Sequence, residues 1–259
     1  MNPSYLFSEV RVFFRSFLIQ AFWNFERIQN IGFAYCIYPF LVNLYPDKEK
    51  RKEAIIRHLE FFCTHPYMVN ILLGLVVSME ERLARGDQGI TGKQISQIKS
   101  HLAGPLAALG DSFFWVTWRS LCAIIAASIY FFSANKIEPA PAFLAVFLFL
   151  ILYNMVHIPV RWFGFSLAYK QGIQIIATIE RFRVLNWGRM IAPVIMTLLI
   201  LMVCSYFIVI EGGGWHKLLL AGFFFALFGF KHKETSTIKV VYFTILICVL
   251  LSYIGATTY

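Results

Sequence analysis

An uncharged run of 21 residues, "MIAPVIMTLLILMVCSYFIVI" at 190–210, constrains this chain most strongly. About 20 consecutive apolar residues make a helix long enough to cross the hydrocarbon core of a bilayer. Comparable runs occupy residues 113–132, 140–158 and 240–256, and a shorter one occupies 215–230. Only 14% of the residues are charged and 59% are hydrophobic, so lipid rather than water is the expected solvent for much of the chain. The pattern predicts an all-α membrane protein with about five transmembrane segments.

Lysine and arginine are distributed unevenly between the connecting segments, which predicts an orientation. Segments 159–189 and 231–239 are basic, whereas 133–139 and 211–217 carry one lysine each. Because basic loops stay in the cytoplasm, we expect the N-terminus inside and the C-terminus outside. The net charge of +9 is then explained by the membrane, and no basic cluster carries a nucleic-acid recognition motif.

The N-terminal part, residues 1–112, differs from the apolar region 113–259 that follows it. Residues 5–22 predict an amphipathic helix, which lies either on the membrane surface or against a partner subunit. Its apolar face comprises Leu6, Val10, Phe13, Phe14, Phe17, Leu18 and Ala21. A charged helix is expected at 47–63, beginning after Pro46.

Two further segments of the N-terminal part suggest interrupted helices. The apolar run 67–79 is too short to cross a bilayer, so a re-entrant hairpin or a helix buried in protein is expected there. Residues 104–111, "GPLAALGD", place Gly-Pro and Gly-Asp at the two ends of a short stretch. This argues against a regular helix throughout the stretch. Thr91 and Gln94 have the spacing of a capping box, which predicts the start of a helix after Thr91 that leads into this stretch.

No catalytic constellation is evident in the sequence. His58, Glu60 and His65 do not have the HExxH spacing that places two histidines on one helix face, and Pro66 interrupts the helix there. The five cysteines form no CxxC pair. Nucleophile-elbow, phosphate-loop and dinucleotide-binding motifs are missing as well. We therefore expect no catalytic residue, metal or cofactor in this chain.

The stretch "QAFWNFERIQN", residues 20–30, places an acid and a base inside apolar surroundings. Ionisable groups at membrane depth are costly and usually face a bundle interior or water. On a helix, one polar sector would collect Gln20, Trp23, Asn24, Glu26, Arg27, Gln29 and Asn30. Amides, a carboxylate and an aromatic platform suit a sugar. The alternative is a structural Glu–Arg pair at a subunit or headgroup interface.

Three longer motifs resemble one known family. "FWNFERIQNIGFAY", "LYPDKEKRKEAIIRHLEFFCTHPY" and "GPLAALGDSFFWVTWR" occur in this order, and they are similar to the IID membrane subunit of the mannose/fructose/sorbose family of the phosphoenolpyruvate-dependent sugar phosphotransferase system. The resemblance implies a bacterial inner (plasma) membrane protein that carries a hexose together with a IIC subunit. It also implies cytoplasmic IIA and IIB proteins that phosphorylate the sugar, with IID itself unphosphorylated.

The resemblance also implies roles for individual residues. The substrate-binding motif carries over to Gln20, Trp23, Asn24, Glu26, Arg27 and Gln29. Trp23, Asn24 and Glu26 are the expected sugar contacts, while Arg27 holds Glu26 or closes an interface. Thr64, His65 and Asp111 match hairpin motifs and support the site from behind. The chain departs from the family pattern at Ala21, Phe22, Ala108 and Ser112, which leaves a diverged, non-transporting regulatory or scaffold subunit as the alternative.

Overall fold

The structure is a computed structural model that describes residues 3–133, 139–181, 186–188, 190–195 and 198–199. The chain forms two compact units, Met1–Pro193 and Val194–Tyr259, and the helices described below belong to the first. The spans expected at 215–230 and 240–256 lie outside the described residues, as do loops 211–217 and 231–239 and most of the run 190–210.

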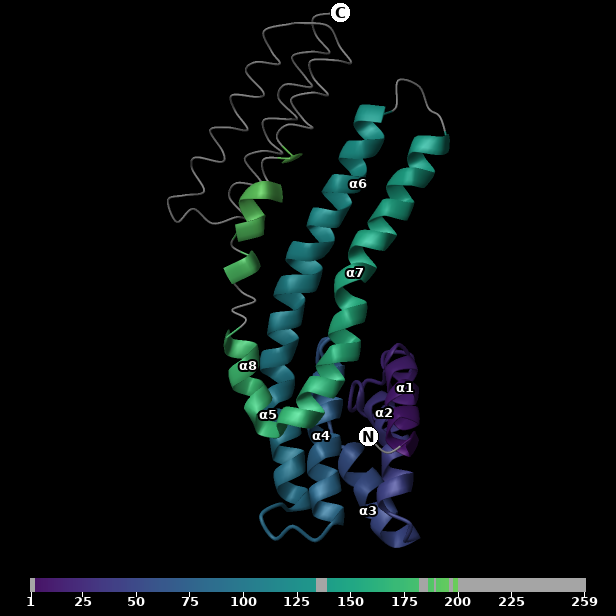
Figure 1. Cartoon of the computed structure of the whole chain (residues 1–259), viewed down its shortest axis with the longest axis vertical. Coiled ribbons are helices and arrows are strands. Elements are labelled where there is room, and N and C mark those ends of the chain that lie inside the picture. Colours follow the sequence, from purple (N-terminus) through teal and green to yellow (C-terminus); the bar gives the residue numbers. More distant parts are fainter. Residues whose placement is uncertain (1–2, 134–138, 182–185, 189, 196–197, 200–259) are drawn as a thin grey trace, which may run out of the picture. The chain divides into compact units, whose positions relative to one another are not determined.

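Four helices form the N-terminal part of the described chain (Figure 1). They are α1 (Pro3–Ser16), α2 (Asn30–Leu44), α3 (Lys48–His58) and α4 (Val69–Ala84). The charged helix α3 begins where the sequence predicts, because the side chain of Asp47 accepts a hydrogen bond from the backbone N–H of Glu49. It ends at His58, earlier than expected, and residues 59–68 form an irregular segment before α4.

The second group of helices contains the long apolar segments. They are α5 (Gly92–Gly110), the π-helix η1 (Asp111–Trp118), α6 (Arg119–Ser133), α7 (Pro139–Gln171), the 3-10 turn η2 (Gly172–Gln174) and α8 (Ile175–Arg181). The capping box of Thr91 and Gln94 is present in full at the start of α5.

The interruption expected at residues 104–111 is wrong, because α5 runs through Pro105 and continues into η1 without a break. The wide π-turns begin only at Asp111, after the Gly-Pro pair. Gly110 serves close packing here: a Cβ at this position would lie 2.3 Å from Cγ of His65. The glycine therefore lets α5 approach the segment before α4.

Helix α4 is the centre of the core, and it packs against α2, α5 and α7. Residues 68–77 are all buried, which fits a helix buried in protein, one of the two expectations for the run 67–79; the re-entrant path stays a prediction. Gly74 makes the closest approach, since a Cβ there would lie 2.2 Å from the backbone oxygen of Phe165 on α7. Small residues at such crossings allow helix backbones to approach each other in membrane proteins.

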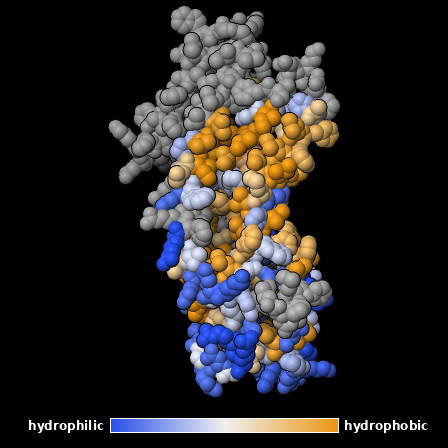
Figure 2. All heavy atoms as spheres, in the orientation of Figure 1, coloured by the Kyte–Doolittle hydropathy of each residue, from blue (hydrophilic) through white to orange (hydrophobic). Residues whose placement is uncertain are grey.

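Within the residues that the structure describes, two helical stretches are long and apolar enough to cross a membrane. Helix α7 has 33 residues, which gives a length of roughly 50 Å, against a bilayer core of about 30 Å. The continuous stretch α5–η1–α6 supplies the other, and α6 runs beside α7 (Figure 1). Hydrophobic residues gather over α6 and α7, whereas hydrophilic ones gather around α3 and the α4–α5 turn (Figure 2). Large apolar side chains such as Phe143, Phe147 and Phe163 are exposed on α7, as expected for contact with lipid.

The amphipathic N-terminal helix is shorter than predicted and uses a different face for packing. It ends at Ser16 rather than at residue 22. Its buried residues include Ser8, Glu9 and Ser16, whereas Phe14 is 65% exposed. The expected boundary between residues 112 and 113 falls inside η1 and stays a prediction.

Candidate functional site

Residues 17–29 connect α1 to α2 as a series of turns, so the helical polar sector expected at 20–30 is wrong. The N–H of Leu18 donates to the oxygen of Arg15, and the N–H of Trp23 donates to the oxygen of Gln20. These bonds close short turns and replace the regular helical ladder. The polar residues are therefore brought together by loop geometry rather than by helical periodicity.

A tight loop at residues 24–28 presents the acid and the base. The backbones of Asn24 and Ile28 exchange two hydrogen bonds, each 3.0 Å long. The side chain of Asn24 also accepts a 2.8 Å hydrogen bond from the N–H of Arg27. Ile28 has a φ of 59°, in the left-handed region that β-branched residues rarely adopt. The loop is thus fixed by its own backbone and by one asparagine.

Gln29 fastens the end of this loop to the segment that follows α3. Its side-chain amide donates to the backbone oxygen of Thr64 and accepts from the backbone N–H of Thr64, both at 3.0 Å. Its own N–H donates to the oxygen of Phe62. Gln29 is buried, and both the nitrogen and the oxygen of its side-chain amide are hydrogen-bonded within this chain. Its contacts hold the loop in place rather than reach toward the surface.

A second line of hydrogen bonds crosses from the loop to the end of α3. The side chain of Asn24 donates to that of Asn30, and Asn30 in turn donates to the backbone oxygen of Leu59, both at 2.8 Å. Arg27 donates to the same oxygen at 3.3 Å and to Glu26 at 3.1 Å. The side chains of Arg27 and Glu26 are 50% and 77% exposed. Water therefore screens this ion pair, and it adds little to stability.

An open cavity of about 540 Å³ lies over this loop. Its lining consists of Asn24, Phe25, Glu26, Arg27, Asn30, Ile31 and Leu59. It offers a carboxylate that accepts hydrogen bonds, a guanidinium that donates them, and amides that do both. Trp23 packs edge-on against Phe25 with 4.8 Å between ring centroids, and both rings are exposed. This combination suits a neutral ligand with many hydroxyl groups.

The other residues of the predicted site lie around this loop rather than in the cavity. Gln20 is exposed on the preceding turn. Thr64 is buried and donates from its hydroxyl to the oxygen of Ala103 on α5. His65 is buried against Phe114. Asp111 is exposed at the start of η1. Thr64 therefore supports the loop through Gln29. Within the part of the chain that the structure describes, neither His65 nor Asp111 forms a hydrogen bond or ion pair with the loop.

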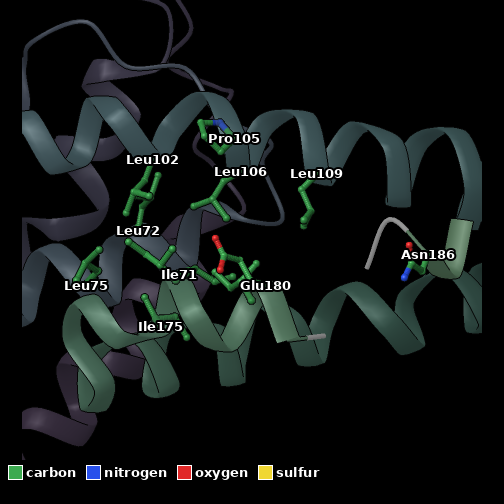
Figure 3. Close-up of a pocket in the computed structure, with 12 residues that line it drawn as sticks. Ile71, Leu72, Leu75, Leu102, Pro105, Leu106, Leu109, Ile175, Glu180 and Asn186 are labelled. Carbon is green, nitrogen blue, oxygen red and sulfur yellow. The ribbon is translucent and has the colours of Figure 1, made fainter. Parts of the chain in front are cut away.

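A second cavity, of about 440 Å³, lies between α4, α5 and α8 and has a different character (Figure 3). Its lining is dominated by leucine and isoleucine side chains, among them Ile71, Leu106 and Ile175 (Figure 3). Glu180 and Asn186 supply the polar atoms. Such a lining offers few hydrogen-bond partners for the hydroxyl groups of a sugar. The cavity over residues 24–28 is therefore the better candidate for a sugar site.

A buried ionic network at Glu80 was not foreseen from the sequence. The carboxylate of Glu80 accepts hydrogen bonds from Arg57 at 2.6 and 3.0 Å, from the hydroxyl of Tyr45 at 2.7 Å, and from Nε2 of His58 at 3.0 Å. Lys99 donates to the backbone oxygen of Arg57 at 2.9 Å. The side chains of the network come from α3, α4, α5 and the end of α2. Because these segments are far apart in the sequence, no local residue spacing predicts the network.

Burial and hydrogen bonding oppose each other in this network. Burial alone would raise the pKa of Glu80, but the hydrogen bonds from His58 and Arg57 lower it to about 2. Burial lowers the pKa of His58, so its imidazole is neutral and donates from Nε2 to Glu80. Among the residues that the structure describes, no three His, Cys, Asp or Glu side chains come together as a metal site. The hydrogen bonds of Glu80 tie α4 to α3 and to the end of α2.

The described chain is thus a helical membrane protein with an exposed polar loop. The family model for the "PTS system mannose/fructose/sorbose family IID component" matches residues 8–211. The chain belongs to this family, and the resemblance seen in its three motifs is confirmed.

Two relatives illustrate the match. The mannose-specific EIID component of Escherichia coli (strain K12) is 42% identical over 171 residues, which cover 65% of this chain and 57% of that protein. The fructose permease IID component of Bacillus subtilis (strain 168) is 36% identical over 165 residues, covering 64% of this chain and 57% of that protein. The alignments therefore span a little over half the length of these relatives.

Two solved structures share the fold over 96% of both chains. One, described as the structure of a membrane protein, has a TM-score of 0.69 at 27% identity. The other, a cryo-EM structure of the mannose transporter ManYZ with microcin E492, has a TM-score of 0.58 at 29% identity. Both support a helical membrane fold for this chain.

Proposed function

We propose that this chain is the IID subunit of a sugar permease, which translocates a hexose together with a IIC subunit while IIA and IIB phosphorylate the sugar. The observation that carries the proposal is the loop at residues 24–28. Its own backbone hydrogen bonds and the side chain of Gln29 fix its conformation. It nevertheless exposes Glu26 and Arg27 beside an open cavity. An open cavity buries little of a small ligand, so a second subunit would complete the site.

The contacts suggest a division of roles within the loop. Glu26 and Asn24 face the cavity and would hydrogen-bond sugar hydroxyls, while Arg27 orients Glu26 through their 3.1 Å contact. Trp23 would stack on a sugar face next to Phe25. Gln29 and Thr64 hold the loop, Gln20 is exposed on the turn before it, and Asp111 begins η1 outside the loop.

The apolar helices and the charge pattern support a proposal for the membrane placement. We propose that α6 and α7 cross a bacterial inner membrane and that α3, with its exposed lysines, lies on the cytoplasmic side. The IIB protein would then approach the face that carries α3. The positions of about five spans, and of a C-terminus outside the cell, are part of this proposal.

Phe22 bears on the alternative of a subunit that no longer transports. Its ring packs against Tyr35 of α2 with 5.1 Å between centroids, and it does not line the cavity. The large side chain at this position therefore leaves room over residues 24–28. This observation favours a transporting subunit over a regulatory or scaffold subunit of the same complex.

The direct test is uptake in cells that lack other hexose phosphotransferase routes. The chain would be expressed with its IIC, IIA and IIB partners, and phosphorylated sugar would be measured over a panel of hexoses. We expect accumulation of at least one sugar phosphate, and none when IIC is omitted. An assembled complex that takes up no hexose would instead indicate the regulatory alternative.

Glu26→Gln is expected to reduce hexose uptake about ten- to a hundredfold, because hydrogen bonds to a charged acceptor contribute about 1.5–3 kcal/mol. The matched control is Glu180→Gln, which removes one exposed carboxylate from α8, away from the cavity over residues 24–28 and from α3. The control should transport like the parent chain. Equal uptake by Glu26→Gln and the parent would remove Glu26 from the site.

A further inference from the structure

Arg161 of α7 is a buried cation whose position the sugar site does not yet explain. It is 3% exposed and belongs to a helix that is apolar enough to cross a membrane. Among the described residues no carboxylate forms an ion pair with it, and its Nε has no hydrogen-bond partner. A guanidinium in such surroundings is expensive, which makes a role for it worth seeking.

Its contacts converge on the two segments that build the candidate site. Nη1 of Arg161 donates to the backbone oxygen and the hydroxyl of Ser16, at 2.9 and 3.0 Å. Ser16 ends α1, so the guanidinium caps the carbonyl end of that helix, where a cation is favoured. The guanidinium also lies 4.7 Å from the ring centroid of Phe17, the first residue of the turns that lead to the loop.

The same guanidinium reaches the other segment through Tyr67. Its carbon lies 5.0 Å from the ring centroid of Tyr67, and that ring also stacks on His157, one turn earlier on α7. Tyr67 follows directly after the stretch around Thr64 that Gln29 holds. Arg161 therefore touches the start of segment 17–29 and the end of segment 59–67, while Gln29, at the far end of the first segment, joins it to the second at Thr64.

We propose that Arg161 is the positioning residue of the site, which fixes segments 17–29 and 59–67 against α7 so that Glu26 and Asn24 face the cavity. Its cation–π contacts and the capped end of α1 take the place of a carboxylate partner. The effect on sugar handling rests on the proposed function, whereas the effect on loop order does not. A displacement of about 1 Å at a binding group can cost about a hundredfold in rate.

Hydrogen exchange on the full-length chain in detergent tests the positioning without any sugar. In Arg161→Gln we expect the backbone N–H groups of Asn24, Ile28, Gln29 and Phe62 to exchange at least tenfold faster, while those of α4 keep their protection. Arg161→Lys should give an intermediate increase, because it keeps the charge but loses the planar contacts with the rings. Arg119→Gln is the matched control, since it removes an exposed cation from the other apolar stretch.

The uptake assay then separates positioning from mere folding. Arg161→Gln should raise the sugar concentration for half-maximal uptake about tenfold, with a smaller change in the maximal rate per assembled complex. Unchanged exchange in segments 17–29 and 59–67, or faster exchange spread evenly over α4 and α5, would overturn the proposal. If the parent complex carries no hexose, the proposed function fails, and the exchange pattern still decides the role of Arg161.

Discussion

Replacing Glu80 by alanine is expected to destabilise the folded chain by about 3–5 kcal/mol. The carboxylate is fully buried and receives the guanidinium of Arg57, the imidazole of His58 and the hydroxyl of Tyr45. Removing it leaves the guanidinium largely buried without its counter-charge and leaves two further donors unpaired. Thermal unfolding of the purified chain in detergent should show a clear loss of Tm.

The neighbouring residue supplies a matched control. Glu81 lies next to Glu80 on α4, but its partners are the exposed Arg85 and the hydroxyl of Tyr169. Glu81→Ala should therefore cost less than about 1 kcal/mol, as is usual for ion pairs that water screens. Equal losses for the two variants would contradict the structural role assigned to the buried network.

The network also predicts how stability depends on pH. The pKa of Glu80 falls from 4.5 to about 2 in the folded chain, so its stabilising contribution is complete above pH 4.5 and is lost as the pH falls toward 2. Burial lowers the pKa of His58 below 6.5, so proton uptake by the unfolded chain adds to the loss below that value. The parent chain should lose Tm between about pH 6 and 2, and Glu80→Ala should follow a flatter curve below pH 4.5.

Gly74→Ala is expected to cost about 3 kcal/mol, at the upper end for an overpacked core. The new Cβ would lie 2.2 Å from the backbone oxygen of Phe165 and could fit only if α4 and α7 moved apart. Because α4 is the centre of the core, the displacement would reach the helices around it. The yield of folded chain in detergent and its Tm should both fall.

The opposite side of the same helix crossing provides the comparison. At Gly164 on α7 an added Cβ would meet Cγ1 of Ile71 at 2.9 Å, and a side chain can rotate away where a backbone cannot. Gly164→Ala should therefore cost about 1 kcal/mol. A Gly74→Ala chain as stable as Gly164→Ala would show that the α4–α7 contact is looser than described.

Periodicity and capping were enough to predict the parts of the fold that depend on neighbouring residues. The long apolar runs predicted helices at 113–132 and 140–158, and Asp47 and Thr91 marked helix starts where the structure has them. The motifs identified the family for the same reason, since each is a continuous stretch of sequence.

Features that depend on distant contacts could not be predicted in this way. A helix was expected through residues 20–30 because on a helix the polar residues of this stretch would gather in one sector. A loop forms instead. It is stabilised by the backbone hydrogen bonds between Asn24 and Ile28 and by the side-chain hydrogen bonds of Gln29 to Thr64. The Gly-Pro pair at residue 104 suggested a break, yet α5 continues past it. The network at Glu80 joins separate helices, and no spacing in the sequence reveals it.

The central claim is that the loop at residues 24–28 forms one part of a sugar site that a IIC subunit completes. Equilibrium binding of radiolabelled hexose tests it most directly, with this chain alone, the IIC subunit alone and the purified pair measured side by side. The account predicts saturable binding by the pair, weak binding by either subunit alone, and weakened binding by a pair that carries Glu26→Gln. Tight binding by IIC alone, unchanged when this chain is added, would contradict it.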